Sequence, residues 1–229
     1  PCGYVEAYKS LRTNLDFMAG SMDVHTLVIT STVPEESKSN VAVNLALTLA
    51  ESGKKVALVD CDLRKPVLHR YLKAGHNVKG VSNVLSNQCT LDEALQELKE
   101  MNLTFLPAGT PPPNPSEMLS QPQMQAMVNT LREKFDVVIF DAPPVSVVTD
   151  AAVIGRYVDG AMFVVRSDYA PADAVRGAVK KLQDAGVRVL GSVLTRYDMK
   201  KALKGSSYAY SYAYNYNYAY EKQKADVVE

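Results

Sequence analysis

The sequence predicts an α/β fold in which a mostly parallel β-sheet is flanked by helices, followed by a C-terminal tail. Short apolar runs alternate with helix-like segments over most of the 229 residues. Several of these runs, such as VALVD and VVIFD, are almost continuously hydrophobic. Such runs are typical of strands that helices cover on both faces. Hydrophobic residues make up 47% of the chain, which is enough for a substantial core.

Six strands and the helices between them are expected in turn. The strands span 25–31, 55–60, 103–107, 136–140, 161–166 and 189–195. Helical patterns cover 39–52, 91–100, 122–134, 150–156 and 171–185, and a further helix is expected at 4–18. Gly53 and Gly186 stand where helix C-caps are expected. The proline-rich run 111–115 is expected to be a rigid, exposed loop near the functional site.

Composition argues against several classes of protein. The 25 basic and 25 acidic residues give a formal net charge of zero, and hence no electrostatic reason to expect nucleic acid as a partner. The three cysteines are far apart, which argues against a disulfide framework or a zinc site. No apolar run approaches the roughly 20 residues that cross a bilayer. No signal peptide is visible, although the sequence starts at Pro1 without methionine.

A phosphate-binding loop is expected after the first strand, in the sequence ITSTVPEESKSNVAVNLA. A turn at Pro34 and the pair Lys38-Ser39 precede an amphipathic helix. In a loop of this kind, backbone N–H groups and the lysine bind phosphate, and the hydroxyl binds Mg²⁺. The complete pattern has glycine at positions 32 and 37, where this chain has Thr32 and Ser37. From the residues alone, Ser39 is also explained as a helix N-cap.

Aspartates close two of the expected strands. Asp60 and Asp62 follow VALV and point to the same side if the chain there is extended. They suit Mg²⁺ binding or removal of a proton from an attacking hydroxyl, and capping aspartates in a loop are the alternative. Asp141 closes the fourth strand, where it suits support of a Mg²⁺ ion held by the loop hydroxyl. Because ligands bind at the carboxyl ends of parallel strands, the three motifs together favour a nucleotide site.

A tyrosine run dominates the C-terminus, where residues 208–220 read YAYSYAYNYNYAY. Seven of the thirteen tyrosines stand there at every second position: Tyr208, Tyr210, Tyr212, Tyr214, Tyr216, Tyr218 and Tyr220. The segment lacks aliphatic residues that could offset the cost of ordering it, so a mobile tail is expected. Clustered tyrosines in such a tail indicate chemistry at their hydroxyl groups. A non-enzymatic aromatic binding or aggregating segment is the alternative.

Together these motifs resemble those of the bacterial tyrosine kinases that accompany capsule and exopolysaccharide synthesis. That family has a P-loop fold related to the MinD and ParA ATPases. The segment TSTVPEESKSNVAVNLA resembles its Walker A region, VALVDCDLRKP its Walker A′ motif, and VVIFDAPP its Walker B motif. EAYKSLRTNL resembles its E-x-x-R-x-x-R helix, with Lys9 in place of the first arginine. AGTPPPNPSEML resembles its P-x-N-P-S-E-L-L segment, and a tyrosine tail is a hallmark of the family.

The resemblance implies a kinase that uses ATP and Mg²⁺ to autophosphorylate its seven tail tyrosines in trans. Nucleotide binding is implied for Ser37, Lys38, Ser39 and Asn40. Binding of the metal ion is implied for Ser39, Asp62 and Asp141. The implied catalytic residues are Lys38, Asp60 and Asp62, with Asp60 as the group that accepts the tyrosine proton.

The resemblance also implies assembly and partners. Glu6, Lys9 and Arg12 share one helix face, and a solvated stripe with local ion pairs is the alternative to a contact between subunits. The family assembles into a ring-shaped homo-oligomer. It works with a membrane-protein activator through that protein's cytosolic segment and with a cognate tyrosine phosphatase, in the cytoplasm at the inner face of the cell membrane. The implied parts are an oligomerisation helix at 1–20, a kinase domain at 21–203 and the tail at 204–229.

The phosphate loop departs from the family pattern P-G-E-G-K-S, because residues 34–39 read PEESKS. Glycine permits unusual φ angles and close approach of the backbone to phosphate. Glu35 and Glu36 add negative charge near an anionic ligand unless they point to solvent. We therefore expect weakened nucleotide binding. A pseudokinase that serves only as a substrate is one alternative. A MinD/ParA-like ATPase is another, although such proteins carry a lysine near the start of the loop, and residues 31–34 contain none.

Overall fold

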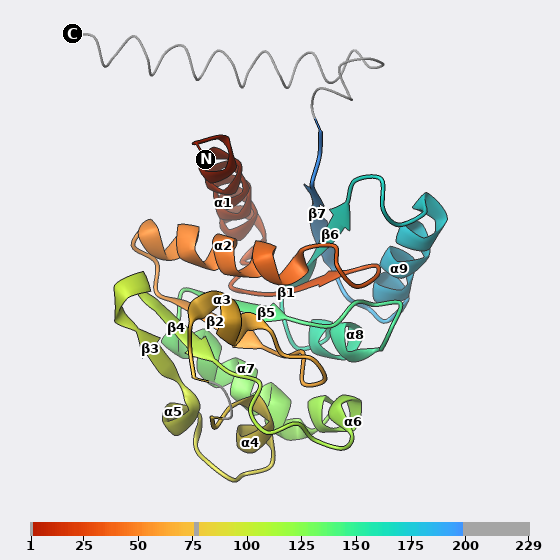
Figure 1. Ribbon diagram of the computed structural model, residues 1–229. Helices are drawn as coiled ribbons and strands as arrows, with labels where there is room; N and C mark the ends of the chain where they lie inside the picture. The colour runs from red at the N-terminus through yellow and green to blue at the C-terminus, as the bar shows by residue number, and fades with distance from the viewer. Residues whose placement is uncertain (1, 76–77, 199–229) are drawn as a thin grey trace, which may run out of the picture. The chain divides into compact units, whose positions relative to one another are not determined.

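The structure is a computed structural model that describes residues 2–75 and 78–198. Pro1–Thr195 is one compact unit, built around a seven-stranded sheet with the order β3-β4-β2-β5-β1-β6-β7 (Figure 1). The strands are β1 (Thr26–Ser31), β2 (Val56–Asp60), β3 (Gln96–Leu98), β4 (Leu103–Leu106), β5 (Val137–Asp141), β6 (Gly160–Arg166) and β7 (Val189–Thr195). The tyrosine run and the expected mobility of 204–229 lie outside the described residues.

The sheet is parallel except at one edge, which confirms the predicted fold class. Every neighbouring pair is parallel apart from β3, which runs antiparallel to β4. The order of the central strands does not follow the chain, since β5 lies between β1 and β2. In this register Asp141 at the end of β5 is paired with Asp60 of β2 and with Ile29 of β1. The carboxyl ends of three strands therefore meet at one edge of the sheet.

Helices cover both faces of the sheet (Figure 1). One face is packed by α1 (Cys2–Met22), α2 (Lys38–Glu51) and α3 (Leu68–Leu72). The other is packed by α4 (Val81–Leu85), α5 (Leu91–Ala94), α6 (Pro115–Leu119), α7 (Pro122–Lys134), α8 (Asp150–Gly155) and α9 (Ala172–Asp184). None of the helices in the described ranges combines the length and hydropathy needed to cross a membrane.

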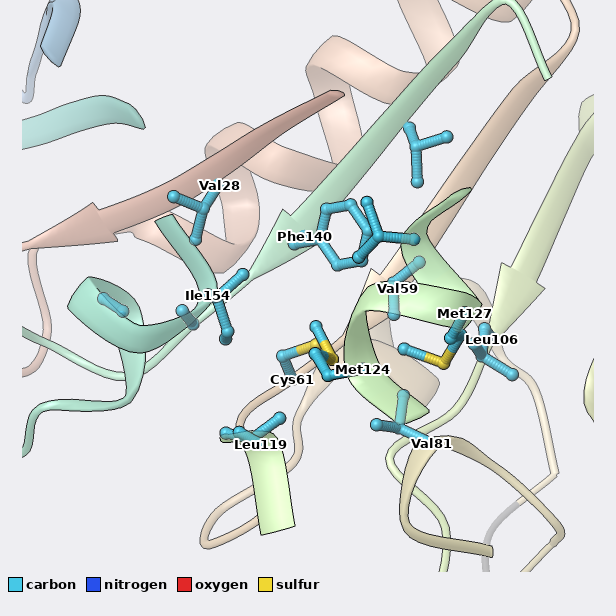
Figure 2. Packing of buried hydrophobic residues seen from close by; sticks show 14 of the residues in the cluster. Val28, Val59, Cys61, Val81, Leu106, Leu119, Met124, Met127, Phe140 and Ile154 are labelled. Atoms are coloured by element: carbon cyan, nitrogen blue, oxygen red, sulfur yellow. The ribbon is translucent and has the colours of Figure 1, made fainter. Parts of the chain in front are cut away.

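Successive side chains of each strand point to opposite faces of the sheet, so the protein has two separate hydrophobic cores. In β5, Val138 and Phe140 face one core, whereas Val137 and Ile139 face the other, as expected for successive side chains of a strand. Figure 2 shows the first core, in which Phe140 and neighbouring strand residues pack against the side chains of α7 and α8. Phe140 is completely buried. The continuous apolar runs in the sequence thus reflect burial on both sides.

Most expected elements are confirmed to within two residues, but the helix predicted at 91–100 is wrong. Only Leu91–Ala94 is helical, and the chain then forms the edge strand β3 and a 3₁₀ turn at Lys99–Met101. Pairing with β4 supplies backbone hydrogen bonds that a helix would otherwise provide. The glycines at positions 53 and 186 have φ angles of 90° and 80°, which confirms their role at helix C-termini.

The short helices α3, α4 and α6 carry too few residues for a periodic pattern and were not expected from the sequence. The proline-rich run is only partly the exposed loop that was predicted. Pro111 is exposed, but Pro115 is buried at the first position of α6. Proline suits that position because its fixed φ angle matches a helix and its missing N–H would have no helical partner.

Candidate active site

Lys38 and Ser39, the first two candidate residues, follow the loop between β1 and α2. Helix α2 begins at Lys38, and Ser37 is its N-cap residue. Ser39 is therefore the second helical residue, and the N-cap explanation of it is wrong. Its Oγ instead donates a hydrogen bond of 2.6 Å to Oδ2 of Asp141. The first N–H groups of α2 have no partner within the helix and point toward the loop, which favours an anion there.

Four predicted residues meet at the end of β1. Nζ of Lys38 lies 3.1 Å from Oγ of Ser39, 3.3 Å from Oδ1 of Asp141 and 3.6 Å from Oδ2 of Asp62. The side chains of Lys38 and Asp62 are about one-tenth exposed, and that of Asp141 is fully buried. Residues more than 100 positions apart in the chain thus form one compact polar cluster at the carboxyl edge of the sheet.

Burial and neighbouring charges shift the pKa values of Lys38 and Asp141 in opposite directions. Burial disfavours the ammonium form of Lys38, but the carboxylates of Asp141 and Asp62 outweigh it and raise its pKa above the usual range. Burial raises the pKa of Asp141, while the Lys38 charge and the hydrogen bond from Ser39 act against the shift. The cluster therefore keeps Lys38 charged at the place where a phosphate would bring further negative charge.

Asp60, the last residue of β2, binds the backbone of the loop that follows this strand. Its two carboxylate oxygens accept hydrogen bonds of 3.2 Å from the backbone N–H groups of Asp62 and Leu68. Burial raises the pKa of Asp60 to about 8, and the nearby Asp141 carboxylate adds to the shift. A carboxylate whose pKa is raised binds a proton more strongly than an ordinary aspartate does, which suits a group that accepts a proton.

A pocket of about 430 Å³ opens beside Asp60. Phe105, Pro107 and Pro111 contribute to its apolar lining, and Arg70 of α3 also lines it. The position of Pro111 agrees with the prediction that the proline-rich run lies near the site. The pocket offers an apolar space next to a carboxylate, which suits an aromatic side chain with a polar end.

The candidate Mg²⁺ site consists of oxygen atoms. Among the described residues no three His, Cys, Asp or Glu side chains are arranged to hold a metal ion by themselves. The donors here are instead the Ser39 hydroxyl and the carboxylates of Asp141 and Asp62, which already surround the Lys38 ammonium. Hydroxyl, carboxylate and phosphate oxygens are the ligands that Mg²⁺ prefers, and it usually takes few of them from the protein. The residues present therefore fit an ion bound together with a nucleotide.

The phosphate loop has left-handed backbone at both positions where the family has glycine. Glu35 has a φ angle of 65° and Ser37 a φ angle of 72°. Glu36, between them, does not point to solvent. It is fully buried, and its carboxylate accepts hydrogen bonds from the N–H groups of Val33 (2.8 Å) and Arg166 (3.2 Å). The chain thus adopts a glycine-type loop conformation with residues that carry a Cβ.

Asn40 was predicted to bind nucleotide, but its side chain is directed to the N-terminal helix. Its Oδ1 accepts hydrogen bonds from the hydroxyl groups of Tyr4 (2.6 Å) and Tyr8 (3.5 Å). Its backbone N–H lies in the first turn of α2. In the same helix, Lys9 pairs with Glu6 at 2.8 Å, and Arg12 donates to the Thr48 carbonyl of α2 at 3.2 Å. The local ion pair agrees with the solvated-stripe alternative, and a contact between subunits stays a prediction.

Sequence reasoning missed one part of the site. Asp150 at the start of α8 is fully buried and binds Nε of Arg64 at 3.2 Å, while the Ser116 hydroxyl donates to the same carboxylate. This network ties the loop after β2 to α6 and α8. The sequence predicts a helix from Asp150 and places Arg64 in the Walker A′ motif, but it does not predict that the two residues pair. Only the charged residue within an otherwise apolar segment of the sequence hinted at a buried partner.

Comparisons with known proteins agree with this geometry. A family model described as an AAA domain matches residues 36–158. The septum site-determining protein MinD of Pyrococcus horikoshii, solved with Mg-ADP, matches with a TM-score of 0.65 over 76% of this chain and 70% of that chain. At 24% identity this match bears on the fold alone. The fold and the loop between β1 and α2 thus give the chain a P-loop fold of the kind that MinD has.

Closer relatives define the family. Tyrosine-protein kinase YwqD of Bacillus subtilis is 36% identical over 203 residues, which are 89% of this chain and 84% of that protein. The kinase domain of Escherichia coli tyrosine kinase ETK has 34% identity and a TM-score of 0.81, over 83% of this chain and 74% of that chain. The chain belongs to the bacterial tyrosine-protein kinases that accompany capsule and exopolysaccharide synthesis.

Proposed function

We propose that this protein is a tyrosine kinase that binds Mg-ATP at the end of β1 and phosphorylates the tyrosines at 208–220 of a neighbouring copy. The observation that carries the proposal is the convergence of side chains from three separate motifs. Ser39, Asp62 and Asp141 each have an oxygen atom within 3.6 Å of Nζ of Lys38. An ATPase that releases phosphate to water could use the same cluster. The seven clustered tyrosines favour a hydroxyl acceptor within the same polypeptide.

The proposed chemistry assigns each residue a simple task. Bound Mg-ATP supplies the phosphoryl group, and the metal ion neutralises part of the triphosphate charge. Lys38 and the N-terminal N–H groups of α2 orient the phosphates, and Ser39, Asp62 and Asp141 hold the ion. Asp60 accepts the proton of the tyrosine hydroxyl as the new O–P bond forms and the bond to ADP breaks. Positioning and charge neutralisation then account for most of the rate.

Assembly and regulation belong to the same proposal. Glu6, Lys9 and Arg12 mediate a ring of copies, and a membrane protein's cytosolic segment activates the kinase at the inner face of the membrane. A cognate phosphatase reverses the modification. From residue 204, an extended chain of about 17 residues reaches roughly 55–60 Å, enough for an adjacent subunit. Several phosphates of about −1.5 to −2 charge each would then weaken the ring by repulsion.

The decisive experiment incubates the purified full chain with Mg-ATP and maps phosphate on the tail by mass spectrometry. Lys38→Met and Asp60→Ala variants are expected to lose incorporation, and Lys180→Met on the surface of α9 serves as the matched control. Mixing a Lys38→Met chain with a tail-deleted active chain tests transfer between copies. Modification of the Lys38→Met tail in that mixture supports the reaction in trans.

Two outcomes would replace the proposal. No phosphate on the tail, together with no binding of Mg-ATP, would make the chain a pseudokinase that serves only as a substrate. Phosphate released to solvent without tail modification, even with an activating peptide present, would indicate a MinD-like ATPase. Weak incorporation that the peptide raises would agree with a kinase that requires its membrane partner.

A further inference from the structure

The unusual conformation of Glu35 has a structural support outside the phosphate loop. Glu35 is exposed and non-glycine, and its φ angle of 65° lies in the left-handed region. A side chain with a Cβ disfavours that region relative to glycine. Without support, the loop would spend much of its time in other conformations. Its N–H groups would then not converge on a phosphate.

Arg166, the last residue of β6, and Tyr169, three residues further along the chain, contact Glu35 directly. Nη1 of Arg166 donates to the Glu35 carbonyl oxygen at 3.3 Å, and the Tyr169 hydroxyl donates to Oε2 of Glu35 at 3.4 Å. The two side chains also contact each other, since Cζ of Arg166 lies 4.2 Å from the centre of the Tyr169 ring. The stacked guanidinium and ring thus bind both the backbone and the side chain of the strained residue.

The neighbouring residue is fixed to the same strand ends. The backbone N–H of Arg166 donates to Oε1 of Glu36, and the Thr195 hydroxyl of β7 donates to the Glu36 carbonyl at 3.0 Å. These contacts hold the base of the loop through the buried Glu36. The contacts of Arg166 and Tyr169 side chains act one residue earlier, at the position where the family has glycine. The two sets of contacts can therefore be separated by mutation.

We propose that Arg166 and Tyr169 are positioning residues that hold Glu35 in the left-handed conformation and so replace the glycine missing from the phosphate loop. This inference rests on the proposed function, because it concerns the same nucleotide site. The pair acts through Glu35 and not on the nucleotide. Its effect should therefore vanish when position 35 is glycine, which reaches the left-handed region without help.

The test is a double-mutant cycle on the full chain, read by the affinity for Mg-ADP. Arg166→Ala is expected to weaken binding of Mg-ADP about tenfold. Without Arg166 a smaller fraction of the protein has the loop in its binding conformation, and the apparent affinity falls by that fraction. Tyr169→Phe removes only the hydroxyl and is expected to weaken binding about twofold to threefold. Glu35→Gly alone is expected to bind at least as well as the unmodified chain. In the Gly background, Arg166→Ala should change the affinity by less than about twofold.

Two controls distinguish a specific effect of Arg166 on Glu35 from a general loss of structure. Arg166→Ala keeps the backbone N–H that binds Glu36, and Arg176→Ala removes another exposed arginine from α9. An equal loss in both backgrounds would refute the inference, because Arg166 would then act on the fold or on the nucleotide itself. Unchanged affinity in Arg166→Ala would refute it as well.

Amide hydrogen exchange at residues 35–39 in nucleotide-free protein gives a second readout. Exchange should be faster in Arg166→Ala, with no comparable increase when the same change is made in the Gly background. This readout does not depend on nucleotide binding. If the protein bound no Mg-ADP, the proposed function would fail while the effect of the pair on the loop could still be measured. Equal exchange with and without Arg166 would refute the pair's role.

Discussion

Ser37 offers a direct measurement of what the glycine-free loop costs. It precedes Lys38 with φ and ψ angles of 72° and 20°, and its side chain makes no capping hydrogen bond. The left-handed conformation costs a residue with a Cβ about 1–2 kcal/mol of conformational free energy. Glycine avoids that cost but loses about 0.4–1 kcal/mol through the greater freedom of the unfolded chain. Ser37→Gly is therefore expected to raise the free energy of unfolding by about 0.5–1 kcal/mol over Ser37→Ala.

Gly177 provides the matched control, because at that position alanine and not glycine should give the higher free energy of unfolding. It lies on the exposed side of α9, and a Cβ added to it would meet nothing within 4 Å. In a helix interior, alanine is favoured over glycine by about 0.5–1 kcal/mol. Gly177→Ala is thus expected to stabilise the protein, whereas at position 37 glycine should be the more stable of the two residues.

Urea unfolding of the nucleotide-free protein, followed by circular dichroism, measures both differences. An increase of 1 kcal/mol corresponds to about 2–4 °C in Tm for a chain of this length, so thermal unfolding gives an independent value. The reasoning is refuted if Ser37→Gly is no more stable than Ser37→Ala. The two positions would then behave alike, and the left-handed angle at Ser37 would store no conformational energy.

Three further changes test the fold that supports the site. Burial acts to raise the pKa of Asp159, but the hydrogen bonds from Arg132 and from the start of β1 outweigh it and lower the pKa. A lowered pKa means that this stability is present above the unfolded value of about 3.9 and is lost as pH falls through the folded value. Asp159→Asn should therefore cost about 1.5–3 kcal/mol at pH 7 and progressively less below about pH 4 in urea unfolding, and a pH-independent cost would contradict the assignment. Tyr4→Phe removes a hydroxyl that joins α1 to α2, so it should cost about 0.5–1.5 kcal/mol, with Tyr71→Phe at an exposed position of α3 as the unchanged control. Phe140→Ala opens a cavity in the core of Figure 2 and should cost about 3–5 kcal/mol by the same method, whereas a loss below 1 kcal/mol would mean that the core collapses around the gap.

Local patterns in the sequence were sufficient for most of the architecture. The apolar runs predicted six of the seven strands. In the central strands, burial on both faces requires hydrophobic side chains at nearly every position. The longer helices were predictable from their periodicity. The exception is β3, a three-residue strand whose backbone pairing with β4 depends on a neighbour and not on its own residues.

The candidate site was predictable in its parts, since Lys38, Asp60 and Asp141 each follow an apolar strand in the sequence. That β5 lies between β1 and β2, and so places Asp141 beside Lys38, was decided only by the tertiary structure. The same holds for Arg166 against Glu35, which are 131 positions apart in the chain. Periodicity and turn chemistry act over a few residues and therefore appear in the sequence. Contacts between distant residues depend on strand order and packing, which no local pattern records.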